Sequence, residues 1–276
     1  MTASDGVGIQ RGGLADRGTV AARIAARDAP LPSLRREPAA VAPPTPTPAP
    51  LPAGVEPYTT IRKRTAAHLS HSLHTAAHAL LVTEVDYGAL DPIRRGAGLT
   101  YLPFVARAVV EAARQFPRVN ATSVDDGLVV SKAVHLGIAI DLSFEGLVVP
   151  VVHDAGDLRL RALAQRVEEL AGRARAGKLA VADLEGGTFT ITNVGSYGTV
   201  SAAPIINHPQ VAILSTDGVR MRPVAVPGDD GEWRLAIRPT GNLSLAFDHR
   251  AFDGAYAAAF LARVRHELEH RDWSAE

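Results

Sequence analysis

Residues 30–57 contain ten of the chain's 19 prolines, and this density limits what the chain can fold into. Proline has no backbone N–H group and a fixed φ angle, so such a segment cannot pair regularly in a helix or a sheet. We therefore expect a linker over residues 30–57. It would separate a short N-terminal segment, residues 1–29, from a folded body, residues 58–276.

Within this body, helix-like and strand-like segments alternate. Amphipathic periodicity predicts helices over 59–73, 102–116, the segment after the expected cap Asp157, and 255–271. Apolar and β-branched runs predict strands over 79–87, 127–131, 134–142, 146–152, 186–195, 210–220, 233–239 and 242–249, with a hairpin turn at 228–232. Long crossovers mixed with adjacent strands predict an α/β fold, an α+β two-layer sandwich in which helices cover a mixed sheet.

Composition excludes several classes of function. Lys and Arg total 29, as do Asp and Glu, so no basic excess indicates a nucleic-acid partner. The absence of cysteine excludes disulfides, thiolate metal sites and a cysteine nucleophile. The sequence shows neither a signal peptide nor a membrane-spanning apolar run, and we expect a cytoplasmic protein without a membrane partner.

The stretch LAFDHRAFDG, residues 245–254, places His249 where an apolar strand ends and Asp253 where the last helix begins. An imidazole on such a rigid platform can take a proton from a hydroxyl or thiol and later return it. A structural interpretation fits the same residues, with Asp253 as a helix cap and Asp248 and Arg250 as a surface pair. This stretch alone favours the structural interpretation.

Four further segments accompany DHRAFDG (248–254): IRKRTAAHLSHSLHTAAHALLVTEVD (61–86), EGLVVPVVHDA (145–155), GGTFTITNVGSYG (186–198) and PIINHPQVAIL (204–214). In order and spacing, all five resemble the catalytic core of the dihydrolipoyl acyltransferases of 2-oxoacid dehydrogenase complexes. This family is related in fold to chloramphenicol acetyltransferase. The resemblance implies that fold, a homotrimer, and an active site between subunits.

The resemblance also implies which residues act. His249 would deprotonate the acceptor for attack on an acyl-CoA thioester, and Thr192 would donate to the developing oxyanion. Asp253 would pair with Arg62 of the opening helix and brace the histidine loop. Positions implied to contact coenzyme A are Arg94 (with Arg95 as its alternative), Thr100, Asp141, Thr192, Asn193 and Val194. No metal is expected, because His68, His71, His74 and His78 fit a polar helix face better than a metal site.

The identity of the acceptor stays open at this point. Residues 1–57 contain no lysine to carry lipoate, and HRDWSAE lacks the apolar tail by which relatives join trimers into a shell. We therefore expect a trimer without that shell, acting as a CoA-dependent acetyltransferase on a small-molecule hydroxyl, as in tetronate biosynthesis. One alternative is a dihydrolipoyl acyltransferase that uses the lipoyl domain of another chain. A second is a non-catalytic assembly subunit.

Overall fold

The computed structural model describes residues 54–276. The predicted N-terminal segment, residues 1–29, and all but the last four residues of the predicted linker lie outside the described residues. The first helix or strand within residues 54–276 is therefore α2 (Thr60–Thr75). Within residues 54–276, no helix is long and apolar enough to cross a membrane.

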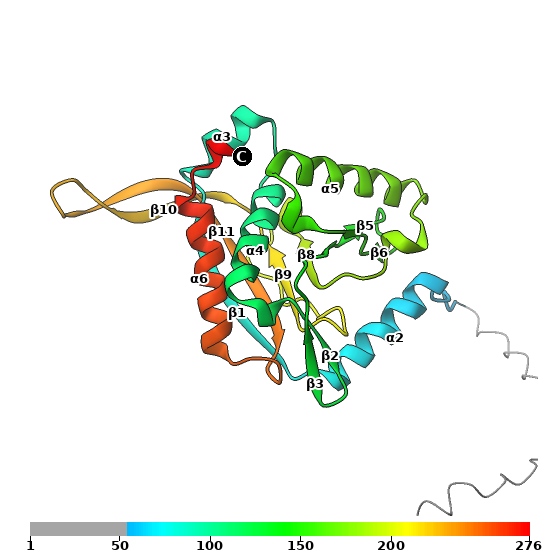
Figure 1. Cartoon of the computed structure of the whole chain (residues 1–276). Coiled ribbons are helices and arrows are strands. Elements are labelled where there is room, and N and C mark those ends of the chain that lie inside the picture. The colour runs from blue at the N-terminus through cyan, green and yellow to red at the C-terminus, as the bar shows by residue number, and fades with distance from the viewer. Residues whose placement is uncertain (1–53) are drawn as a thin grey trace, which may run out of the picture. The chain divides into compact units, whose positions relative to one another are not determined.

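A seven-stranded mixed sheet forms the centre of the fold (Figure 1). Its strands lie in the order β1 (His78–Asp86), β11 (Trp233–Asp248), β9 (Ala212–Thr216), β8 (Phe189–Asn193), β4 (Leu136–Ile138) and β7 (Val151–Val152), while β10 (Arg220–Pro227) pairs with β11. Strand β8 runs parallel to both of its neighbours, and the other pairs are antiparallel. The predicted mixed sheet is confirmed.

Three helices pack around the core of this sheet: α4 (Leu102–Gln115), α5 (Leu160–Arg175) and α6 (Gly254–His270) (Figure 1). The sequence predicts one apolar face on α4, and Phe104, Ala108 and Ala112 are all fully buried there. Along the sheet, the alternation in β8 buries Phe189 and Ile191 against these helices. The predicted layer of helices on a mixed sheet is therefore confirmed.

The remaining elements lie at the margins of the sheet. They are α2 (Thr60–Thr75), α3 (Leu90–Ala97), the hairpin of β2 (Ala121–Val124) and β3 (Gly127–Val130), the hairpin of β5 (Ile140–Asp141) and β6 (Leu147–Val148), and short 3₁₀ turns at Pro117–Val119, Ala155–Asp157, Val181–Asp183, Gly195–Tyr197 and Trp273–Ala275. The sequence did not predict α3, β2 or β10. The two strands predicted over 233–239 and 242–249 are one continuous strand, β11.

The predicted cap of α5 is wrong. Asp157 belongs to a short 3₁₀ turn, and α5 begins only at Leu160. The N–H group of Leu160 donates instead to Oε2 of Glu276, at 3.2 Å. A residue more than a hundred positions away thus satisfies an N–H group that the helix leaves unpaired.

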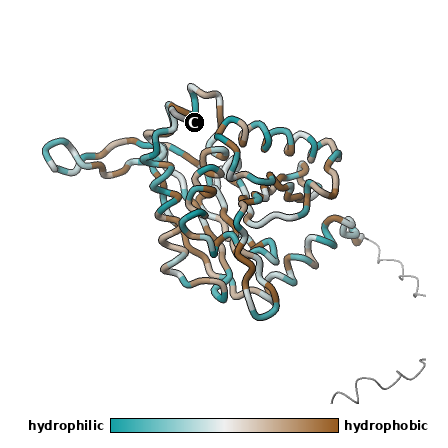
Figure 2. Tube along the Cα trace, in the orientation of Figure 1, coloured by the Kyte–Doolittle hydropathy of each residue, from teal (hydrophilic) through white to brown (hydrophobic). Residues whose placement is uncertain are grey.

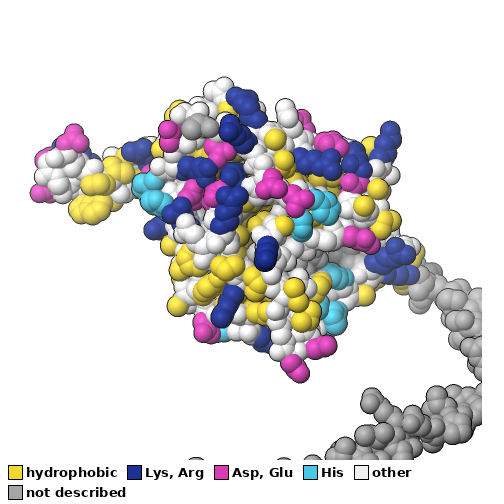
Figure 3. All heavy atoms as spheres, in the orientation of Figure 1, with side chains coloured by type: hydrophobic (Ala, Val, Ile, Leu, Met, Phe, Trp, Pro, Cys, Tyr) yellow, Lys and Arg dark blue, Asp and Glu magenta, His cyan; other side chains and the backbone are white. Residues whose placement is uncertain are grey.

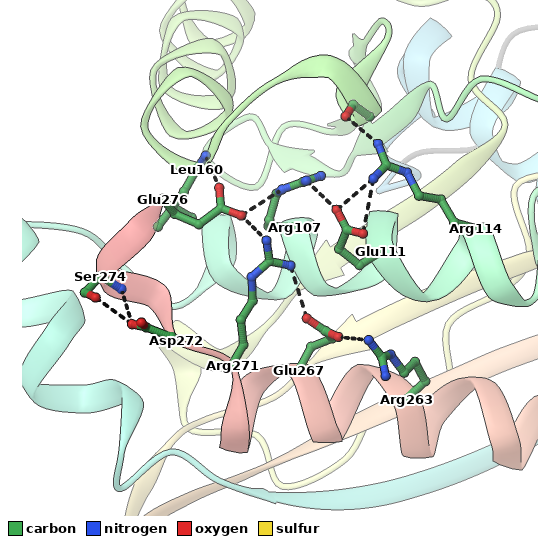
Figure 4. A network of polar contacts seen from close by, with 11 residues as sticks. Arg107, Glu111, Arg114, Leu160, Arg263, Glu267, Arg271, Asp272, Ser274 and Glu276 are labelled. Atoms are coloured by element: carbon green, nitrogen blue, oxygen red, sulfur yellow. Dashed lines mark hydrogen bonds and ion pairs between the residues drawn. The ribbon is translucent and has the colours of Figure 1, made fainter.

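This contact belongs to a polar network that ties the C-terminal segment to the helices (Figure 4). Its ion pairs join Arg107 to Glu111 and Glu276, Arg271 to Glu276 and Glu267, and Arg263 to Glu267. Beside the network, the buried ring of Trp273 meets Phe104 edge-on, with ring centres 5.1 Å apart. The segment 271–276 therefore packs on its own chain.

Candidate functional site

His249 is the first residue after β11, and its backbone is held tightly. Its N–H group donates to the carbonyl oxygen of Ala77 at 2.8 Å, which ties the turn to the segment between α2 and β1. The imidazole is 51% exposed, and its Nδ1 atom lies 3.5 Å from Oδ1 of Asp253. An aspartate at Nδ1 favours the tautomer with its proton on that atom, which leaves Nε2 as the basic nitrogen for an acceptor.

The residue before His249 fixes the turn. Asp248 and Arg250 form the pair that the structural interpretation expects, but only Arg250 reaches the surface, because Asp248 is buried. The carboxylate of Asp248 accepts from the Nε and backbone N–H groups of Arg250 and from the N–H group of Ala77. Burial alone would raise the pKa of Asp248, but these hydrogen bonds outweigh it and hold the pKa below its usual 3.8. The contacts of Asp248 with Arg250 and Ala77 therefore hold the turn that presents the imidazole of His249.

Replacing Asp248 by asparagine is expected to lower the free energy of unfolding by about 2 kcal/mol at neutral pH, because it removes the charge that Arg250 faces. Since the pKa of Asp248 is lowered by folding, its stabilisation is present above the unfolded-state pKa and disappears as the pH falls through the folded-state value. Urea unfolding between about pH 6 and pH 2 measures both effects. Equal acid sensitivity of wild type and Asp248→Asn would contradict this prediction.

Asp253 occupies the N-cap position of α6, as predicted, with φ −86° and ψ 165°. Within the described residues, however, its carboxylate makes no capping hydrogen bond. The carboxylate is 85% exposed and faces the imidazole of His249. The Asp253 carboxylate therefore contacts the imidazole of His249 and does not cap α6.

The predicted pair between Asp253 and Arg62 is wrong for the described part of a single chain. Arg62 lies in the first turn of α2, where its Nη2 atom donates to the carbonyl oxygen of Phe144 at 2.7 Å. The far end of this helix leads to Ala77, which contacts the His249 turn. At a rise of about 1.5 Å per residue, Arg62 is roughly 20 Å from that turn, too far for an ion pair.

Thr192 and His249 lie at opposite ends of the sheet. Thr192 of β8 aligns with Ser215 of β9, and Ser215 aligns with Ser244 of β11. His249 follows Ser244 by five residues along β11. Strand rise and strand spacing place the two Cα atoms roughly 19 Å apart. One chain therefore does not bring the predicted base and the predicted oxyanion donor together.

The positions implied to contact coenzyme A gather at the Thr192 end. Thr100 and Asn193 line a cleft of about 270 Å³ whose wall includes the buried carboxylate of Asp217. Asp141 and Arg62 line a second cleft, of about 590 Å³, between α2 and the β5–β6 hairpin. The register of β4 with β8 puts Asp141 at the same end of the sheet as Asn193 and the residue that follows it, Val194.

Arg94 lies beside the smaller cleft and is held from two sides. Its Nη2 atom is 2.7 Å from the buried carboxylate of Asp91, and its guanidinium lies 4.2 Å from the ring centre of Tyr101, which lines that cleft. Arg95 pairs with the same carboxylate at 2.6 Å but is far more exposed. The contact of Arg94 with coenzyme A stays a prediction, and the structure holds this residue next to the cleft.

The sequence did not predict a set of contacts that α2 makes with Asn207 and His208. His68 pairs with the side chain of Asn207 at 2.9 Å, and the rings of His71 and His208 meet edge-on with centres 5.0 Å apart. Burial and the nearby His71, His68 and Arg250 side chains lower the pKa of His208. Histidine spacing in α2 was the only signal of this cluster. Among residues 54–276, no group of side chains suits a metal ion.

Comparisons with known proteins identify the family. The family model for the catalytic domain of 2-oxoacid dehydrogenases acyltransferase matches residues 52–273. This chain belongs to that family. It is 39% identical over 228 residues to the dihydrolipoyllysine-residue acetyltransferase component of the pyruvate dehydrogenase complex of Mycobacterium bovis, covering 78% of this chain and 41% of that protein. It is 38% identical over 221 residues to the dihydrolipoyllysine-residue succinyltransferase component of the 2-oxoglutarate dehydrogenase complex of Bartonella vinsonii subsp. berkhoffii, covering 76% and 52%.

Solved structures confirm the predicted fold of this acyltransferase. A probable dihydrolipoamide acetyltransferase from Listeria monocytogenes superimposes with a TM-score of 0.72 at 37% identity, covering 80% of this chain and 97% of that one. The dihydrolipoamide acetyltransferase of Azotobacter vinelandii gives 0.73 at 30% identity, covering 84% and 99%; that work concerns a serine, a histidine and an asparagine in its catalytic mechanism. Chloramphenicol acetyltransferase, at 0.51 and 15% identity over 78% of this chain and 100% of that one, shares the fold alone.

The expected small-molecule hydroxyl acceptor is wrong. The curated relatives are acyltransferase components of 2-oxoacid dehydrogenase complexes, which supports the alternative based on a dihydrolipoyl group. The expectation relied on the absence from residues 1–57 of a lysine that could carry lipoate. The match to the family lies in residues 52–273, which include the whole folded body.

Proposed function

We propose that this chain transfers an acyl group between coenzyme A and the dihydrolipoyl thiol of a lipoyl domain. The observation that supports this most directly is the geometry of His249 in a member of this family. The imidazole is half exposed, its Nδ1 atom faces Asp253, and its turn is tied to Ala77. Such an imidazole has one nitrogen held by the protein and the other free for a thiol.

The reaction follows from that arrangement. Nε2 of His249 takes the thiol proton while the sulfur attacks the thioester carbonyl carbon. The carbonyl oxygen becomes negative, and the hydroxyl of Thr192 donates a hydrogen bond to it. The tetrahedral intermediate then expels the other thiol as thiolate, which recovers the proton from His249. The acyl group has changed sulfur atoms, and the histidine is again neutral.

Binding of coenzyme A is proposed for the Thr192 end of the sheet. Thr100 and Asn193 offer hydrogen bonds in the smaller cleft, and Arg94 offers a guanidinium beside it for a phosphate. Asp141 lies in the larger cleft at the same end. Because Thr192 and His249 are far apart in one chain, we propose a site shared between copies of the chain in a trimer.

The test is an assay of the full-length chain with acetyl-, succinyl- and branched-chain acyl-CoA. Free dihydrolipoamide, a separately produced lipoyl domain and hydroxylated small molecules serve as acceptors, and mass spectrometry detects the acylated product. We expect acylation of the dihydrolipoyl thiol, fastest on the lipoyl domain. Acylation of a hydroxyl without acylation of dihydrolipoamide would overturn the proposal.

A further inference from the structure

Most acidic side chains of this protein lie on its surface among Lys and Arg side chains (Figure 3), but a few are buried. Within residues 54–276, the buried charged residues that form ion pairs are Asp91 with Arg94, Arg107 with Glu111, Asp183 with Arg173, Asp248 with Arg250 and Glu267 with Arg271. Asp217 is only 5% exposed, yet no cation in this part of the chain pairs with it. A buried charge without an opposite charge is costly, and at a functional site such a cost is often part of the mechanism.

Only neutral groups hold the Asp217 carboxylate in place. The hydroxyl of Ser244 donates to Oδ2 at 3.1 Å, and the hydroxyl of Thr199 donates to Oδ1 at 3.3 Å. Burial raises the pKa of Asp217, and these bonds, together with one from the backbone of Ala202, offset only part of that effect. The carboxylate is therefore fixed in position, but its negative charge is not neutralised.

This charge lies on the same face of the sheet as Thr192. Thr192 aligns with Ser215 of the next strand, and Ser215 aligns with Ser244. Residues directly opposite each other on paired strands point to the same face. Because Ser244 donates to Asp217, the carboxylate of Asp217 lies on that face as well. Strand rise and strand spacing place the Cα atoms of Asp217 and Thr192 roughly 8 Å apart.

The arginines around this end of the sheet are engaged with other groups. Arg94 pairs with Asp91, and Arg220 donates to the carbonyl oxygen of Gly198 at 3.1 Å. An anionic group placed beside Thr192 therefore meets the charge of Asp217, whereas an uncharged group does not.

We propose that Asp217 selects the acyl group, by admitting uncharged acyl groups and excluding those that end in a carboxylate, such as succinyl. Membership of the family does not decide this choice, because its members include acetyltransferase and succinyltransferase components. The terminal carboxylate of a succinyl thioester is only three carbon–carbon bonds from the carbonyl group that Thr192 would hold. It therefore stays within range of Asp217. This inference rests on the proposed function and names the acyl groups that its site takes.

The size of the effect follows from Coulomb's law. Two unit charges about 8 Å apart, at an effective dielectric constant of about 20, repel each other by an energy equivalent to roughly 30-fold in affinity. Asparagine has nearly the shape of aspartate and keeps an oxygen that accepts hydrogen bonds, so Asp217→Asn removes the charge with little change in the size of the site.

Thioesters that differ by one carboxylate test the proposal. Transfer from butyryl-CoA and from succinyl-CoA to dihydrolipoamide is compared as kcat/KM for the full-length chain at neutral pH, and circular dichroism verifies the fold. Asp230→Asn, at the hydrophilic tip of the hairpin of β10 and β11 (Figure 2), removes an equal charge away from the site. We expect wild type and Asp230→Asn to favour butyryl-CoA by at least about 10-fold, and Asp217→Asn by less than about 3-fold.

Binding measures the same discrimination without turnover. The butyl and carboxypropyl thioethers of coenzyme A have no carbonyl group at sulfur and do not transfer an acyl group. Isothermal titration calorimetry compares their dissociation constants. We expect the carboxypropyl thioether to bind wild type at least about 10-fold more weakly than the butyl thioether, and Asp217→Asn to remove most of this difference.

Two results would overturn the role of Asp217: a wild type that takes both acyl groups equally well, or an Asp217→Asn variant that keeps the wild-type ratio. Failure of the proposed function is seen separately. In that case no acyl-CoA acylates dihydrolipoamide, while the two thioethers still bind wild type with the expected difference. If neither thioether binds, both proposals fail.

Discussion

Replacing His249 by alanine is expected to lower the rate of acyl transfer to dihydrolipoamide by about 1,000-fold, because the variant has no base for the thiol proton. The fold should be unaffected. The turn is held by the backbone N–H of His249 and by the carboxylate of Asp248, and both remain in the variant. Steady-state kinetics with acetyl-CoA measure the loss, and a variant that keeps more than a tenth of the wild-type rate would exclude His249 as the base.

Asp253 provides the matched comparison, because it acts on the reaction only through His249. Its carboxylate lies 3.5 Å from Nδ1 of the imidazole, four positions along the chain from His249. Asp253→Asn keeps an oxygen that can accept from Nδ1 and should cost less than about 10-fold, whereas Asp253→Ala should cost more. We expect both variants to change the pH profile of kcat, which a merely structural role would leave unchanged.

The sequence predicted those parts of the molecule that depend on neighbours in the chain. The alternation in β8 and the spacing in α4 placed Phe189 and Phe104 in the core, where the structure has them. The junction of a strand end and a helix start placed His249 on a rigid platform, and it does follow β11 directly. In each case a period or a boundary along the chain carries the information.

Features that depend on distance across the fold were missed or predicted wrongly. Arg62 was matched to Asp253 by motif, but Arg62 lies in the first turn of the 16-residue helix α2, and the rest of that helix separates it from the His249 turn. The separation of Thr192 from His249 follows from a strand register that no local pattern encodes, and only the resemblance to the family implied a site between subunits. The turn at 228–232 was predicted, but its first strand, β10, was not, because prolines give that strand weak strand propensity.

Two inactive variants are expected to restore activity to each other when they assemble together. Thr192→Ala alone should lose about 100-fold in kcat, because a single oxyanion donor is removed, and His249→Ala should lose more. In a mixed ring of three, one of the three sites takes Thr192 from one variant and His249 from the other. Coexpressed variants with different affinity tags, purified through both tags, should therefore show about one third of the wild-type kcat.

The size of this recovery separates two arrangements of the site. If the site lies within one chain, neither variant contains an intact site. Mixed assemblies would then have no more activity than the less impaired variant, Thr192→Ala, which is about 1% of the wild-type kcat or less. Two differently tagged copies of Thr192→Ala, the less impaired variant, purified in the same way, give the background. Activity no higher than that background, in assemblies of confirmed mixed composition, would contradict a site that combines Thr192 of one chain with His249 of another. Recovery near one third would mean that Thr192 of one chain acts with His249 of a neighbouring chain, because the two residues are roughly 19 Å apart within one chain.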